Sequence, residues 1–347
     1  MIFSVMKPRF LAISALSLGL AVSYAAVPAN GQKKGQQIEK PLAGLRATPL
    51  QITSIYVTPS TNAQRIDKVQ IGREMVVAEK SGAWMRIYAN TDIEEMHNDR
   101  DTPMVGSEND SPPPVSGWIQ AKGVVEEDTA NGDVVVMGTA ANQESLAEDP
   151  RGPANAAQSA RLLYHRVVEM FPNSPLAPEA AWRAADIHWQ LQKAEASTRP
   201  SSKEQKPYMR DLMDEDDLRK VVRLYPHTRW AALAAFDLID NKLCGDWQGT
   251  TQCPEKEADV YEKYADEYPD GPRTAQALYQ ATYRLAALVN IYDAAGGVGK
   301  GKDAHNHARE LAQKLKAHFA DSEYTWRAGA LVYKLDEDIP VYGIDLN

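Results

Sequence analysis

The tetrapeptide Phe171-Pro172-Asn173-Ser174 begins a pattern that returns three more times in this chain of 347 residues. The related corners are Tyr225-Pro226-His227-Thr228, Tyr268-Pro269-Asp270-Gly271 and Phe319-Ala320-Asp321-Ser322. Eight residues after each proline, or after Ala320 in its place, the chain has an alanine, and these are Ala180, Ala234, Ala277 and Ala328. The pattern predicts four copies of one structural unit.

The residues before each corner have the apolar spacing of an amphipathic helix. Leu163, Val167 and Phe171 recur in four-residue steps on one helical face, and the other copies repeat this spacing. Proline cannot continue a helix and restricts the residue before it, so the chain turns at the corner. Ser174 and Thr228 can then cap a second helix. Each unit is therefore predicted to be a helix, a corner and a helix, which bury their apolar faces by stacking on neighbouring units.

This pattern resembles tetratricopeptide (TPR) repeats, in particular those of envelope proteins such as the outer-membrane-assembly lipoprotein BamD and the periplasmic TPR partner of the Tol-Pal system. The resemblance covers roughly residues 150–336 and implies an all-α solenoid at 154–336 that binds another envelope protein. The corners are 54, 43 and 51 residues apart, whereas a regular TPR has a period of ~34 residues. Polar insertions near residues 193–214, 244–253 and 296–303 account for the surplus.

Between Leu50 and Val125 the apolar period becomes that of short strands, which predicts a small all-β barrel at residues 48–126. The elements Ile71-Gly72, Gly82-x-Trp84-x-Arg86-Ile87 and Gly117-Trp118-Ile119 resemble a bacterial SH3 (SH3b) domain. An insertion at 91–114, with seven acidic residues against Arg100, is predicted to be a mobile acidic loop.

Aromatic residues of the predicted barrel are the candidate ligand site. Strand alternation places Trp84, Arg86 and Tyr88 on one face and Met85 and Ile87 on the core face. With Tyr56 and Trp118, the first three could stack on sugars or peptides. The alternative is that Trp84 and Trp118 only cover the barrel core.

The N-terminus has the layout of a secretory signal peptide. Lys7 and Arg9 precede an apolar run from Phe10 to Val22, and small residues offer cleavage after Ala25 or Ala29. We predict a signal peptide at 1–29, without excluding an uncleaved anchor, and no later membrane segment. Because no cysteine lies near the cleavage region, we predict a soluble periplasmic protein rather than a lipoprotein, and association with the outer membrane stays open.

The remaining segments are assigned by composition. Residues 30–47 are predicted to be a flexible lead-in, 127–153 a linker and 337–347 a C-terminal tail. The short run Val134–Met137 either adds a strand to the barrel or docks it on the helices. Without the leader the net charge falls from −9 to −11, which argues against nucleic-acid binding.

The chain has two cysteines, Cys244 and Cys253. In an exported chain an even pair predicts a disulfide, here one that closes an inserted loop. The rival interpretation is a pair of free or metal-binding thiols.

Signatures of catalysis and of cofactor binding are weak. Gly296-x4-Gly301-Lys302 imitates a phosphate-binding loop, but Asp303 replaces the required Ser or Thr. His305 and His307 do not belong to an H-E-x-x-H zinc motif. We therefore predict no catalytic residues, no metal and no cofactor.

The sequence favours a non-enzymatic envelope adaptor. The SH3-like resemblance implies contact with peptidoglycan or a peptide, and the TPR-like resemblance implies a protein partner. Two alternatives remain: a subunit or chaperone of outer-membrane protein assembly, and a cell-wall hydrolase or its activator.

Overall fold

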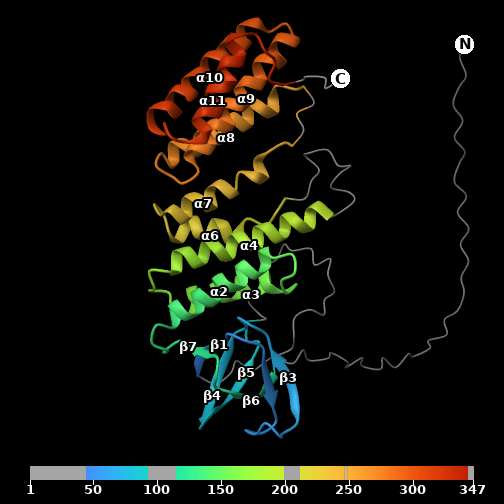
Figure 1. Cartoon of the computed structure of the whole chain (residues 1–347), viewed down its shortest axis with the longest axis vertical. Coiled ribbons are helices and arrows are strands. Elements are labelled where there is room, and N and C mark those ends of the chain that lie inside the picture. The colour runs from blue at the N-terminus through green and yellow to red at the C-terminus, as the bar shows by residue number, and fades with distance from the viewer. Residues whose placement is uncertain (1–43, 93–114, 199–211, 246, 248, 343–347) are drawn as a thin grey trace, which may run out of the picture. The chain divides into compact units, whose positions relative to one another are not determined.

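The structure is a computed structural model that describes residues 44–92, 115–198, 212–245, 247 and 249–342. An N-terminal antiparallel sheet is followed by a series of α-helices, which confirms the predicted order of a β part and an α part (Figure 1). The predicted signal peptide, most of the lead-in, most of the acidic loop at 91–114 and the end of the tail lie outside the described residues. So does part of the insertion at 193–214.

Seven strands form the sheet, in the order β3-β2-β6-β5-β4-β1-β7. Their bounds are β1 (Leu45–Pro49), β2 (Thr53–Tyr56), β3 (Arg65–Val69), β4 (Met75–Ser81), β5 (Trp84–Ala89), β6 (Val115–Gln120) and β7 (Val124–Glu126). The predicted turn between β4 and β5 is present, with Gly82 at φ 60°.

Strand β1 corrects the prediction that residues 30–47 are only a flexible lead-in. It pairs with β4 and β7, and its Ala47 is buried in the sheet core. This core lies on one side of the pleat, where Ile55, Ile87 and Ile119 are fully buried. A strand of five residues preceded by a polar segment gives too short an alternation for the sequence pattern to identify.

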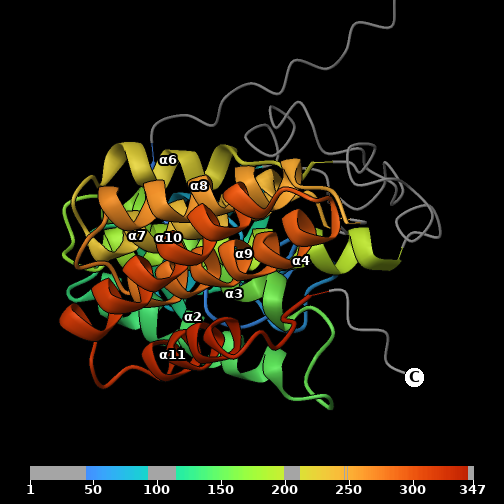
Figure 2. The same ribbon diagram turned by 90° about the horizontal axis from the view of Figure 1, so that it is seen from above.

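The helices follow the sheet along the chain. They are α2 (Gly132–Glu148), α3 (Ala156–Met170), α4 (Ala177–Thr198), α6 (Asp216–Leu224), α7 (Arg229–Asp237), the 3-10 turn η2 (Asp240–Lys242), α8 (Gln252–Glu267), α9 (Thr274–Ala294), α10 (Val298–His318) and α11 (Glu323–Asp336). Figure 2 shows the same ribbon from above, with the helices seen side-on and α10 and α11 in front.

The four aromatic corners have one backbone conformation. Phe171, Tyr225, Tyr268 and Phe319 each end a helix, with φ between −133° and −124° and ψ between 44° and 64°. Each donates its backbone N–H to the carbonyl four residues earlier. Phe319 adopts this conformation before Ala320, so the aromatic helix end does not depend on the following proline.

The alanines eight residues after the corner position are all fully buried: Ala180, Ala234, Ala277 and Ala328. They lie in the second helices α4, α7, α9 and α11. A small side chain at this point lets two helices approach closely, as the spacing predicted. The next helix begins with the predicted cap at one corner, where Thr228 Oγ1 accepts a hydrogen bond from the Ala231 N–H at 3.2 Å.

Helix α2 overturns the assignment of residues 127–153 as a linker. Val136 and Ala140 of α2 pack with Leu163 and Tyr164 of α3 in one buried cluster, so the run Val134–Met137 is helical rather than a strand. The segment is rich in alanine and asparagine, and composition alone did not separate a helix with few large apolar residues from a linker. The insertion at 296–303 is corrected in the same way, because α10 already begins at Val298.

The sheet contacts the first helices through both a tight turn and charged groups. Gly72, in the predicted Ile71-Gly72 turn, has φ +79°, and a Cβ there would lie 2.8 Å from Leu162 Cβ of α3. Nearby, Arg166 of α3 pairs with Glu74 and Asp92, all buried. Among the described residues, no helix has the length and apolar character needed to cross a membrane.

Candidate functional site

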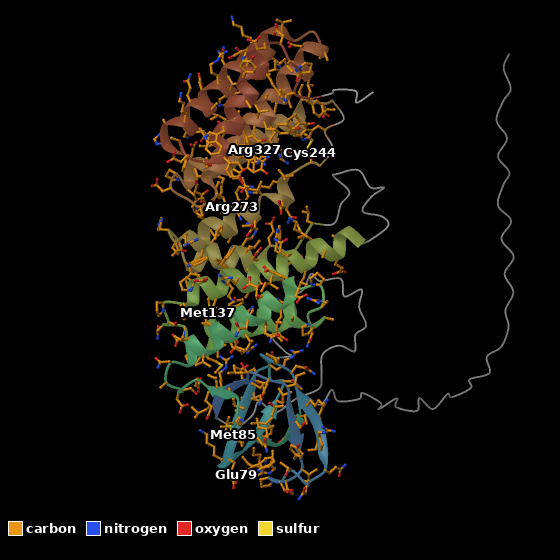
Figure 3. The ribbon with its side chains drawn as sticks, viewed as in Figure 1. Glu79, Met85, Met137, Cys244, Arg273 and Arg327 are labelled. Carbon is orange, nitrogen blue, oxygen red and sulfur yellow. A yellow bond between two sulfur atoms is a disulfide. The ribbon has the colours of Figure 1, made fainter. Side chains whose placement is uncertain are left out.

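A row of side chains crosses the outer face of the sheet. Tyr56 of β2 is the register partner of Trp118 of β6, which is in turn the partner of Arg86 of β5. Arg86 is also opposite Glu79 of β4, one of the sheet residues labelled in Figure 3. Because directly opposed residues of antiparallel strands share a face, these four side chains form one line across the sheet.

Trp84 and Tyr88 extend this line along β5, since they are two residues before and after Arg86 on the same face. The Trp84 and Tyr56 rings meet edge to face, with centroids 5.6 Å apart and an interplanar angle of 88°. We call Tyr56, Trp84, Arg86, Tyr88 and Trp118 the aromatic face.

The alternation predicted for β5 is confirmed. Met85 and Ile87 are buried in the sheet core, whereas Arg86 is exposed and Trp84 and Tyr88 are partly exposed. Trp84 and Trp118 are therefore on the side opposite the core residues, which weakens the interpretation that they only cover the core. Partly exposed rings beside a guanidinium suit flat apolar surfaces that carry hydroxyl or carboxylate groups, such as sugar rings or peptides.

A second candidate is a notch between α3, α4 and α6. Its walls include Val168, Val221 and Leu224, and the volume of its cavity is about 60 Å³. The alanines that contribute to its lining are Ala181, Ala184 and Ala185 of α4. Their small side chains leave room for one apolar side chain of a partner.

Acidic groups at the notch are already paired within the chain. Asp217 accepts from His188 Nδ1 at 2.9 Å and from Arg161 Nη2 at 3.3 Å. Burial raises its pKa, but the hydrogen bond from His188 and the charge of Arg161 outweigh burial and hold the pKa below its ordinary value. Glu169 behaves alike: against burial, His165 and Arg166 lower its pKa to about 2. The carboxylates at the notch are therefore ionised, and each is already paired with basic side chains of the same chain.

A carboxylate cluster between α4 and α7 was missed at the sequence level. Asp237 accepts from Trp182 Nε1 at 3.4 Å, and Asp186 and Asp240 act on it electrostatically. Burial, followed by the charge of Asp186, raises the pKa of Asp237 to about 7. Asp186 and Asp237 are 51 residues apart in the sequence, so no local pattern could have brought them together. Within the described ranges, no group of three or more His, Cys, Asp or Glu side chains is arranged to hold a metal ion.

Cys244 and Cys253 are joined by a disulfide, with Cα atoms 5.9 Å apart. Cys253 belongs to the first turn of α8 rather than to a loop, so the bridge ties that helix to the segment after η2. The Cys244 N–H donates to Glu257 Oε1 at 2.8 Å, and Glu257 also pairs with Arg284 of α9 at 3.0 Å. These contacts indicate a structural role for the disulfide, which helps to hold the start of α8 in place.

Comparisons with known proteins give no functional assignment. No family model matches the chain, and no curated protein matches it. Similar solved structures include the DHF79 filament, with 14% identity, a TM-score of 0.23 and coverage of 58% of this chain and 96% of that one. The de novo designed helical repeat protein DHR64 has 14% identity, a TM-score of 0.22 and coverage of 60% and 92%. The DHF58 filament has 16% identity, a TM-score of 0.23 and coverage of 59% and 91%. Such low scores carry no argument about this chain.

Proposed function

We propose that this chain is a non-enzymatic, exported adaptor of the cell envelope. In this proposal the sheet is an SH3-like module that binds peptidoglycan or a peptide, and the helix pairs are TPR-like repeats that bind a partner protein. Binding proceeds by surface complementarity with no chemical step, cofactor or nucleic acid. The leader pattern at residues 1–29 supports export to the periplasm.

The aromatic face is the observation that carries the proposal. Four aromatic rings and a guanidinium gather on three adjacent strands, on the side opposite the core, and they belong to Tyr56, Trp84, Tyr88, Trp118 and Arg86. Packing of the sheet does not require partly exposed tryptophans there, because Met85, Ile87 and Ile119 fill its interior. Rings held by paired strands are pre-organised, which lowers the entropic cost of binding a ligand.

The helix pairs support the second half of the proposal. Four corners of one conformation, each followed by a buried alanine, fit a stack of repeated units, the architecture that TPR-like proteins use to bind polypeptides. The notch beside Val168 and Leu224 offers a place for one apolar side chain of a partner.

The test is co-sedimentation of the exported chain with purified peptidoglycan sacculi. We expect the wild type to pellet, and the double variant Trp84→Ala/Trp118→Ala to bind at least about tenfold more weakly, equivalent to about 1.4 kcal/mol. Arg86→Ala should also weaken binding. The matched control is Ile66→Ala, which removes an exposed side chain from β3 of the same sheet and should bind as the wild type does.

Four outcomes would redirect the proposal. Failure of the wild type to pellet would overturn peptidoglycan binding. Equal loss in the Ile66 and Trp84 variants would remove the aromatic face from the argument. Release of soluble wall fragments would favour a hydrolase or its activator, and capture of unfolded outer-membrane polypeptides would favour the role in outer-membrane protein assembly.

A further inference from the structure

Helix α11 (Glu323–Asp336), the last helix described, has an apolar outer face. Trp326 is 67% exposed and Tyr333 is 61% exposed, although both are large and aromatic. Gly329 and Ala330 between them are exposed as well. Exposed apolar patches of this kind are typical of surfaces that bind another protein.

These four residues share one helical face, since they are three, four and seven residues apart. Their order is large, small, small, large, and it is the same in both chain directions: Trp326-x2-Gly329-Ala330-x2-Tyr333. A Cβ at Gly329 would meet no atom within 4 Å, so Gly329 fits no neighbour within the chain. The glycine therefore leaves a shallow groove on the outside of α11.

We propose that the outer face of α11 binds the α11 of a second copy of this chain in an antiparallel pair. A twofold axis midway between Gly329 and Ala330 puts the small residues of both helices at the crossing point. Close approach of two helices requires small residues there. Trp326 then lies opposite Tyr333 of the partner subunit, where the crossing helices diverge and a large side chain is needed to fill the gap.

Charge supports the antiparallel direction. Glu323 and Lys334 flank the same edge of the apolar face. In this arrangement Glu323 and the partner's Lys334 are offset along the helix axis by two residues. At 1.5 Å per residue this offset is about 3 Å. The symmetry makes this ion pair twice. A parallel pair would put Glu323 level with Glu323 of the partner subunit, and neither Glu323 nor Lys334 would meet an opposite charge at its own level.

Other charged groups of α11 are engaged within the chain. Asp336 on the far edge accepts from Arg309 and His305 of α10, at 2.5 Å and 2.9 Å. Arg327, labelled in Figure 3, lies over the Tyr279 ring of α9, with its guanidinium carbon 4.9 Å from the ring centroid. Glu323 forms a long, exposed ion pair with Arg327, at 3.7 Å between Oε2 and Nη1, and an exposed pair of this kind costs little to exchange for one with the partner's Lys334. A contact confined to one helix is small, and we expect a Kd on the order of 10 µM.

Sedimentation equilibrium of the exported chain tests the pairing at protein concentrations of about 1 to 500 µM, a range that brackets that Kd. We expect a reversible monomer–dimer equilibrium, and a Kd at least about tenfold higher for Trp326→Glu and for Gly329→Leu, since 1.4 kcal/mol is a factor of ten. Val298→Glu, at a residue 70% exposed on α10, is the matched control and should leave the Kd unchanged. A monomeric wild type over the whole range, or a Trp326→Glu variant that dimerises as the wild type does, would overturn the proposal.

Two further variants fix the direction of the pair. Glu323→Lys and Lys334→Glu should each weaken the dimer, and the double variant should restore it. Because both native cysteines form the disulfide, Ala330→Cys supplies the single free thiol needed for a short bismaleimide cross-link between subunits. Val298→Cys should not cross-link. No restoration in the double charge variant would overturn the antiparallel arrangement.

Discussion

Arg166 of α3 donates through Nη2 to Oδ2 of Asp92, just after β5, at 3.1 Å, and both side chains are at most 3% exposed. Through Nη1 the same guanidinium binds Glu74 Oε2 at 3.0 Å, next to β4. One cation of the first corner unit thus bridges two buried carboxylates of the sheet, which also pair with Arg46 and Arg73. The β part and the α part therefore share a buried charged contact.

Replacing Arg166 by alanine should destabilise the protein by about 1.5–3 kcal/mol, because Asp92 and Glu74 lose their charge-assisted hydrogen bonds to it and keep only Arg73 and Arg46 as cationic partners. Chemical denaturation followed by circular dichroism measures this change. Arg219→Ala is the matched control: the Arg219 side chain is 65% exposed, and its partner Glu215 keeps a hydrogen bond from Asn241, so its loss should cost less than about 1 kcal/mol. Equal effects of the two variants would contradict the role given to Arg166.

The buried alanine after the third corner gives a second prediction. Ala277→Leu adds three carbons where α9 packs in the core with α8, and overpacking of this kind should cost about 1–3 kcal/mol. Thermal unfolding measures the loss. Ala317→Leu, an exposed alanine on α10, should change stability by less than about 0.5 kcal/mol. A tolerated Ala277→Leu would show that close helix approach is not what requires the alanine.

The sequence predicted the corner units because their determinants are local. An aromatic residue, followed by proline in three of the four copies, and an alanine eight residues later recur in order, and each acts on its own neighbourhood of the chain. The same holds for β5, where Trp84 to Tyr88 alternate strictly. The locations of these elements in the structure follow from periodicity alone.

Other features depend on contacts between distant residues. Helix α2 has few large apolar residues, and its helical state depends on Val136 and Ala140 packing on α3. Arg166 and Asp92 are 74 residues apart, and each alone resembles a solvated surface charge. The Asp237 cluster was missed for the same reason, since its pKa shift arises from burial between two helices.

Asp237 gives a prediction about pH. Its pKa is about 7 in the folded protein and 3.8 in the reference state, so the folded state binds the extra proton between those values. Stability should therefore fall as pH rises from about 4 to 7, because ionisation of the buried carboxyl is penalised. Asp237→Asn removes this penalty and keeps an acceptor for Trp182. We expect it to raise the free energy of unfolding at pH 8 by about 2–4 kcal/mol, with little change at pH 4.

Urea unfolding at several pH values checks this expectation. Asp321→Asn, at an exposed corner residue, is the control and should shift all values alike. Glu169 and Asp217 do not obscure the result, since their pKa values are lowered and their contributions are lost only in the acid range below about pH 4. A stability difference between wild type and Asp237→Asn that is independent of pH would contradict the raised pKa.

The disulfide between Cys244 and Cys253 gives the last prediction. It closes a segment with a sequence separation of nine residues, and such a bridge should contribute roughly 2–3 kcal/mol by restricting the unfolded chain. Reduction should lower the Tm of the wild type by roughly 3–8 °C, whereas Cys244→Ala/Cys253→Ala should have the lower Tm with or without reductant. The Glu257–Arg284 pair should keep the start of α8 in place at temperatures below the transition. Thiol titration of the unreduced, denatured wild type decides the chemistry: no reactive thiol is expected, and two reactive thiols would contradict the bridge.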